Sequence, residues 1–244
     1  MTGSDRFFPR ITTGDRYAKK SFDCIHFRGV DMVAAQLSAR ELFRAAYENR
    51  YTWDANFPGY RANVTYSDGN QSWQGSVEVS ADLKPSISGI DEPEVVKLIH
   101  GQLFEVAIHR VRRGFEDTHS KNEFEFGNSD NDGTVEILVN GKSAGDRYKV
   151  RDNEVVLVHR HIHGVVVTIN TFSTHKSAEG YLSHRYDSVY HDPTTGEQKG
   201  DRSEFEDEYV TVGGYQLLSA RTIRSASGTI SFRFSDLELL APAA

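Results

Sequence analysis

The sequence has little cysteine and a shortage of basic charge. Its 244 residues include one cysteine, Cys24, which cannot form a disulfide within the chain. Domains stapled by disulfides carry an even set of cysteines, so a reducing, cytoplasmic location is expected. Acidic residues outnumber Lys and Arg by 35 to 28, giving a formal net charge of -7. Such a balance offers no general attraction to a phosphate backbone, and no nucleic-acid partner is expected.

Long apolar runs are also missing. No stretch approaches the roughly 20 apolar residues that a transmembrane helix needs. Residues 1–31 contain no continuous apolar block of the kind found in a secretory signal. We therefore expect a protein that is neither secreted nor membrane-spanning.

Recognisable catalytic motifs are the third absence. The chain has no Gly-x-Ser-x-Gly elbow, no Cys–His spacing typical of a thiol nucleophile and no glycine-rich phosphate loop. No cofactor is expected, and the sequence favours a non-enzymatic protein.

Two helices are predicted. Ser38 and Glu41 have the spacing of a capping box, and an apolar stripe follows from Leu42 to Tyr47. A longer helix is expected after Asp91, which we place at the N-cap, with a broad apolar face that ends before Gly114. In this second helix the apolar residues reach far enough round to predict burial on two sides.

Most of the remaining sequence predicts strands. Two alternating runs flank Asp68-Gly69, which is a strong hairpin signal. From residue 122 to residue 240, strand-like segments are separated by short turns, so the strands should form an antiparallel meander. The acidic stretch 196–208 is expected to be a solvated sheet face, or else a site for a cation or partner.

These elements predict an α+β fold with a curved antiparallel β-sheet or half-barrel and two amphipathic helices packed on its concave face. Residues 1–35 are expected to form an N-terminal arm or leader. Residues 36–240 are expected to form a single domain, since no change in composition marks a further boundary.

Several segments resemble a known family. They are 39–53, 58–62, 108–110, 179–182 and 213–215. These segments are similar to a cyanobacterial and plastid family catalogued as domain of unknown function 3386, over roughly residues 36–240. The order of helix, hairpin, long helix and meander resembles the lipoprotein-carrier (LolA-like) fold, in which helices cover a half-open barrel that shelters an apolar ligand. The resemblance implies a photosynthetic origin, and with it a cytoplasmic protein or one peripheral to the thylakoid membrane. It supplies no catalytic residue.

Aromatic residues are plentiful, with 14 Phe, 11 Tyr and 2 Trp. They could line a ligand cavity on the concave face, or they could simply form a packed core. The candidates for the cavity are Trp53, Tyr60, Tyr66, Trp73, Phe172, Tyr181, Tyr186 and Tyr215.

Two polar groups are further candidates. His159 and His161 alternate on one strand and could bind a metal ion, although His163 would be too far away without a bend. Alternatively these histidines face solvent or form hydrogen bonds. His109, Arg110 and Arg113 could bind an anionic head group, or could complement the negative end of the helix dipole.

Three functional hypotheses follow from the sequence. The first is a non-enzymatic protein that holds a hydrophobic or amphiphilic small molecule, a lipid or pigment, in the half-barrel. The second is an interaction or assembly factor that offers its acidic sheet face and basic helix end to protein partners. The third is a metal-dependent hydrolase that uses His159 and His161.

Overall fold

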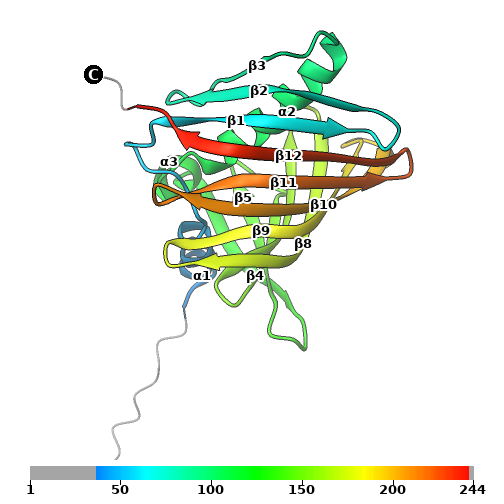
Figure 1. Cartoon of the computed structure of the whole chain (residues 1–244). Helices are drawn as coiled ribbons and strands as arrows, with labels where there is room; N and C mark the ends of the chain where they lie inside the picture. The colour runs from blue at the N-terminus through cyan, green and yellow to red at the C-terminus, as the bar shows by residue number, and fades with distance from the viewer. Residues whose placement is uncertain (1–36, 242–244) are drawn as a thin grey trace, which may run out of the picture. The chain divides into compact units, whose positions relative to one another are not determined.

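A computed structural model describes residues 37–241. These residues form one compact unit, built on a twelve-stranded antiparallel sheet (Figure 1). The helices are α1 (Ala39–Glu48), α2 (Pro93–Arg110) and α3 (Phe115–His119). The strands are β1 (Gly59–Ser67), β2 (Ser72–Ser80), β3 (Pro85–Ser88), β4 (Asn122–Ser129), β5 (Val135–Gly141), β6 (Arg147–Arg151), β7 (Glu154–Ile162), β8 (Val165–Ser177), β9 (Gly180–His191), β10 (Gln198–Val212), β11 (Tyr215–Ser225) and β12 (Gly228–Leu239).

The sheet is open, and its order explains the path of the helices. The strands run β3-β2-β1-β12-β11-β10-β9-β8-β7-β6-β5-β4, so β3 and β4 are the two edges. These edge strands are consecutive in the sequence, and only α2 and α3 lie between them. The chain must therefore cross the sheet from one edge to the other, which it does through α2 and α3. The predicted fold class, a curved antiparallel sheet with helices on its concave face, is confirmed.

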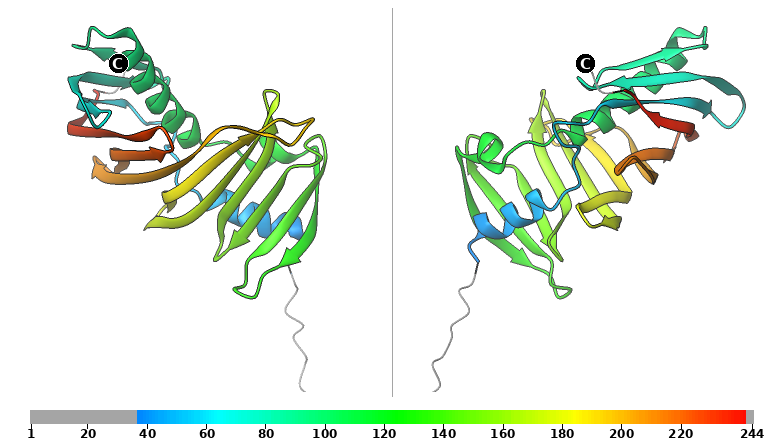
Figure 2. Two further views of the ribbon diagram at one scale, coloured as in Figure 1. Left: turned by 90° about the vertical axis from the view of Figure 1, so that its right-hand side faces the viewer. Right: turned by 60° about the vertical axis from the view of Figure 1, so that its left-hand side comes forward.

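Two hydrophobic clusters hold the helices on the sheet. In the first, the buried side of α2 packs against β1, β2, β11 and β12, with Ile99 and Leu103 almost completely buried. In the second, Phe43 of α1 and Phe115 of α3 pack against β5, β6 and β7. Figure 2 shows α1 and α2 against these different parts of the sheet. The apolar interior is thus divided between two helix-covered regions.

The predicted hairpins and the first helix are confirmed. Asp68-Gly69 joins β1 to β2, and Tyr66 pairs with Trp73 across the hairpin. Consecutive strands from β4 to β12 pair with one another, as a meander requires. Ser38 and Glu41 form the capping box at the start of α1.

The second helix differs from its prediction in three ways. Its N-cap is Glu92 rather than Asp91, and no side chain caps it. It ends at Arg110, because Val111 has an extended backbone, and the short helix α3 follows. Phe104 and Ile108 are 48% and 37% exposed, so burial on two sides does not occur. The described residues bring no second layer over that side of α2.

The acidic stretch also needs a correction. Asp207 has the same alternation as Phe205 and Tyr209, and it is completely buried. It forms a two-bond ion pair with the buried Arg221 on β11: Arg221 Nε donates to Oδ1 at 2.8 Å and Nη2 donates to Oδ2 at 2.6 Å. Glu204 and Glu208, which have the opposite alternation, are exposed as expected.

In the range 37–241, no helix combines the length and the apolar character needed to cross a bilayer. The predicted N-terminal arm at residues 1–35 lies outside the described residues.

Replacing Asp207 by Asn should leave the buried Arg221 guanidinium without its anion. We expect the free energy of unfolding to fall by about 3–5 kcal/mol, measured by urea denaturation. Replacing both partners together, with Asp207→Leu and Arg221→Met, should restore most of this loss because no buried charge remains.

The exposed pair Arg61–Glu238 is the matched control. It has the same chemistry, with Arg61 Nη2 2.7 Å from Glu238 Oε2, but both side chains are more than half exposed. Glu238→Gln should cost no more than about 1 kcal/mol. Equal losses at Asp207 and Glu238 would show that the buried pair has no special importance.

A buried histidine gives a second prediction. His119 is 4% exposed among aromatic rings that include Phe43 and Tyr148, and its Nδ1 lies 3.2 Å from Asn122 Nδ2. Burial, with smaller effects from Arg160 and other arginines, lowers its pKa from 6.5 to about 4. As the pH falls from 6.5 towards 4, the unfolded chain therefore takes up a proton that the folded chain does not, and stability decreases.

His119→Phe should remove this effect. Between pH 7 and pH 5, the free energy of unfolding should fall by about 2 kcal/mol less in the variant than in the wild type, measured by urea denaturation. If the two proteins show the same pH dependence over this interval, His119 is not held neutral by the fold.

Candidate functional site

The C-terminal end of α2 is held against a segment that follows α1. The backbone N–H of Trp53 donates to the carbonyl oxygen of Arg110 at 2.8 Å, and that of Tyr51 donates to Tyr181 O on β9 at 2.9 Å. The segment 50–53 therefore bridges the end of α2 and the start of β9. As a result, Arg50 and Arg110 lie in the same region of the structure.

Four basic residues gather at this end of α2. We call Arg50, Arg110 and Arg113, which surround His109, the arginine cluster. Burial lowers the pKa of His109 to about 4, and Arg110, Arg50 and Arg113 are among the positive charges that lower it further. His109 is nevertheless exposed to solvent.

No carboxylate forms an ion pair with the cluster in the described part of the chain. Within residues 37–241, no Asp or Glu oxygen lies within 4.0 Å of a cluster arginine. Arg50 donates to the carbonyl oxygen of Tyr47 and stacks on its ring, 3.9 Å from the centroid. Arg110 Nη2 donates to the Tyr209 hydroxyl at 3.0 Å, whereas its Nε is buried with no hydrogen-bond partner.

This arrangement is suited to an oxyanion. A guanidinium presents several N–H groups in a fixed plane and binds carboxylate or phosphate oxygens with two parallel hydrogen bonds. The predicted set His109, Arg110 and Arg113 is therefore brought together by the structure. Arg50 was missed because nothing in the sequence indicates that it lies beside α2.

The eight aromatic candidates are not brought together in one cavity. Trp53, Tyr60, Tyr66 and Tyr181 are at most 5% exposed. Their rings pack on other rings or core residues, as where Trp53 stacks on Phe57 at 4.0 Å. Tyr66 packs on the half-buried Trp73 at 5.3 Å, and Tyr186 stacks on Phe205 at 4.7 Å.

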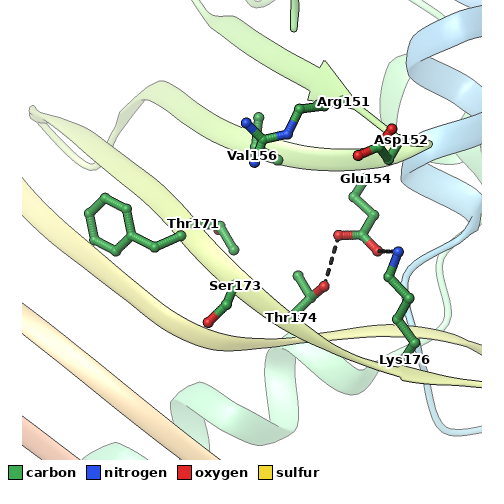
Figure 3. A pocket seen from close by; sticks show the side chains of 9 residues that line it. Arg151, Asp152, Glu154, Val156, Thr171, Ser173, Thr174 and Lys176 are labelled. Atoms are coloured by element: carbon green, nitrogen blue, oxygen red, sulfur yellow. Dashed lines mark hydrogen bonds and ion pairs between the residues drawn. The ribbon is translucent and has the colours of Figure 1, made fainter. Parts of the chain in front are cut away.

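The two remaining candidates line two separate pockets. Tyr215 borders a polar pocket of about 380 Å³ together with Tyr51, Thr52, Asp54, Arg112 and Glu179. Phe172 borders a smaller pocket of about 110 Å³, shown in Figure 3. There the Glu154 carboxylate accepts a hydrogen bond from Thr174 and pairs with Lys176 at 3.4 Å. Neither pocket has the mainly apolar lining typical of a lipid cavity.

The predicted histidine pair lies on β7, next to the hairpin turn. His163 and Gly164 form that turn, with φ values of +50° and +78°, so no bend brings His163 back towards the pair. Each ring of the pair has its own partner: His159 Nδ1 lies 2.8 Å from Thr168 Oγ1, and His161 Nδ1 lies 3.3 Å from Asp146 Oδ1. Neither residue belongs to a group of three metal-ligating side chains in the described part of the chain.

Comparison with known proteins adds a family. The model of a family described as "Protein of unknown function (DUF3386)" matches residues 34–240. The chain belongs to the DUF3386 family. No curated protein matches it.

Solved structures resemble the DUF3386 chain weakly. A LolA superfamily protein from Nitrosomonas europaea is similar at 10% identity with a TM-score of 0.31, over 85% of this chain and 96% of that one. A domain assigned as an outer membrane lipoprotein-sorting protein, from Vibrio parahaemolyticus, is similar at 10% identity with a TM-score of 0.34, over 84% and 94% of the two chains.

The arginine cluster can be tested directly. Arg110→Met removes a positive charge beside His109, so the pKa of His109 should rise from about 4. Arg113→Met should give a smaller rise, because Arg113 contributes less to the shift. Titration of the histidine ring signals by NMR measures both. A larger rise in the Arg113 variant would contradict the proposed arrangement of the cluster.

Proposed function

We propose that this DUF3386 protein binds an anionic amphiphile at the C-terminal end of α2. The arginine cluster holds the head group, and the exposed apolar side of α2 contacts the hydrocarbon part. The observation that carries this function is the arginine cluster itself, because no Asp or Glu oxygen in residues 37–241 lies within 4.0 Å of its guanidinium groups.

The helix dipole alone gives no sufficient reason for this cluster. A helix C-terminus carries about half a negative charge, which favours one cation nearby rather than several. A bound carboxylate or phosphate group would accept hydrogen bonds from the guanidinium groups and offset the repulsion among the arginines.

The apolar contact surface lies on the same helix. Phe104 and Ile108 are one turn apart and exposed, and the ring of His100 is stacked on Phe104 with the centroids 6.3 Å apart. Ile108 precedes His109 directly, so the apolar surface adjoins the basic one. This places the ligand at the surface of α2. The aromatic core beneath the helix is occupied by protein side chains.

The interaction-factor hypothesis is less well supported. It needs a free acidic face on β10, yet Glu206 is paired with Arg224 at 3.0 Å and Glu208 lies near two histidines. The pairing with Arg224 neutralises part of the charge that the face could offer to a basic partner.

Phosphatidylglycerol is the first ligand to test, because it combines an anionic head group with hydrocarbon chains. Short-chain phosphatidylglycerol should bind to the wild-type chain in isothermal titration calorimetry, and short-chain phosphatidylcholine should bind much more weakly. Arg110→Met combined with Arg113→Met should reduce the affinity by about thirtyfold, at about 1 kcal/mol for each arginine near an anionic surface.

Arg233→Met is the matched control for charge. Arg233 is exposed on β12 and has no carboxylate within 4.0 Å in the described residues, but it lies outside the cluster. It should leave the affinity unchanged. Equal binding of the two lipids, or an equal loss in the Arg233 variant, would contradict binding at the arginine cluster.

A further inference from the structure

A second polar group lies across the middle of the sheet. His175 on β8, His184 on β9 and Glu208 on β10 come from three neighbouring strands. One potential ligand atom from each residue lies within 4.8 Å of the other two. Among residues 37–241, no other three histidine, cysteine or acidic side chains come close enough together to share a metal ion.

The distances in this group match those between the ligands of a small cation. His175 Nε2 lies 3.2 Å from Glu208 Oε2, and His184 Nε2 lies 3.3 Å from Glu208 Oε1. Zinc binds histidine nitrogen and carboxylate oxygen at about 2.0–2.2 Å in tetrahedral geometry, which separates neighbouring ligand atoms by about 3.3 Å. Because the two histidines contact different oxygens of Glu208, this carboxylate would bind the ion through both oxygens or turn to present one of them.

The His184 ring has a contact that orients it towards Glu208. Ser173 Oγ lies 3.1 Å from His184 Nδ1, which fixes the ring and directs Nε2 towards Glu208. This Nε2 is buried, and Glu208 Oε1, although close, is not in hydrogen-bonding geometry with it. The contact between Ser173 and His184 Nδ1 corresponds to the hydrogen bond that usually orients a metal-binding histidine through the nitrogen that does not bind the metal.

The second ring and the carboxylate complete the group. The His175 ring packs on the His184 ring with centroids 4.4 Å apart, and its Nε2 has a long contact of 3.3 Å with the carbonyl oxygen of Asp207. A metal ion would replace that weak contact. Glu208 is 51% exposed, so an ion can enter from solvent.

We propose that His175, His184 and Glu208 form a binding site for a divalent transition-metal ion, with Zn²⁺ the expected ion. Two imidazoles and one carboxylate supply three ligands and leave the fourth position open to water or to an anionic ligand. This site lies on β8 to β10 and is separate from the predicted pair His159 and His161 on β7. It does not depend on the proposed binding of an amphiphile.

Metal binding is measured on the full chain, without an affinity tag and after dialysis against a chelator. Co²⁺ should bind with a stoichiometry of one and give the visible absorption of tetrahedral coordination, and Zn²⁺ should displace it. Glu208→Gln and His184→Ala should each abolish the absorption. Ser173→Ala should weaken Zn²⁺ binding by roughly 10- to 100-fold, as expected when the outer support of a ligand is lost.

His159→Ala is the control, because it removes a histidine from the competing pair without touching the proposed site. It should bind Co²⁺ as the wild type does. Glu208→Gln changes an exposed side chain and is expected to fold, which circular dichroism verifies. The proposal is overturned if the wild type binds no metal, if Glu208→Gln binds as well as the wild type, or if His159→Ala abolishes binding.

Discussion

The buried ion pair between Asp207 and Arg221 ties the long helix to the centre of the sheet. Arg221 also donates to Gln102 on α2 and to the Tyr186 hydroxyl on β9, so four elements meet at one guanidinium. Burial alone would lower the pKa of Arg221, but Asp207 and Tyr186 raise it above its ordinary value. Neither buried charge can be left without the other, and the hydrogen bond from Arg221 to Gln102 links α2 to this pair.

The position of α2 determines where ligands can be held. The helix belongs to the connection between the two edge strands, and its buried side fills the space above β1, β2, β11 and β12. Helix α1 fills the corresponding space above β5 to β7. The two sites proposed above, the end of α2 with its arginine cluster and the polar group on β8 to β10, lie outside these two packed regions.

Local patterns predicted most of the fold. The Ser38 capping box, the Asp68-Gly69 turn and the alternation of the strands depend on neighbouring residues, and all three are present in the structure. Alternation also places Asp207 on the same side of β10 as Phe205 and Tyr209, which is the buried side. It was misassigned because a carboxylate is normally exposed, and the partner that permits its burial lies on another strand.

The sequence by itself determined the class of the fold, the antiparallel meander and the basic character of the end of α2, because each follows from periodicity or composition over a short range. Only the tertiary structure decided which of these groups meet. Arg50 joins Arg110 through the pairing of segment 50–53, and Glu208 joins His175 and His184 through the order of three strands. The spacing of these residues along the chain does not predict that they lie close together, because their proximity depends on strand order and on the packing of α2 across the sheet.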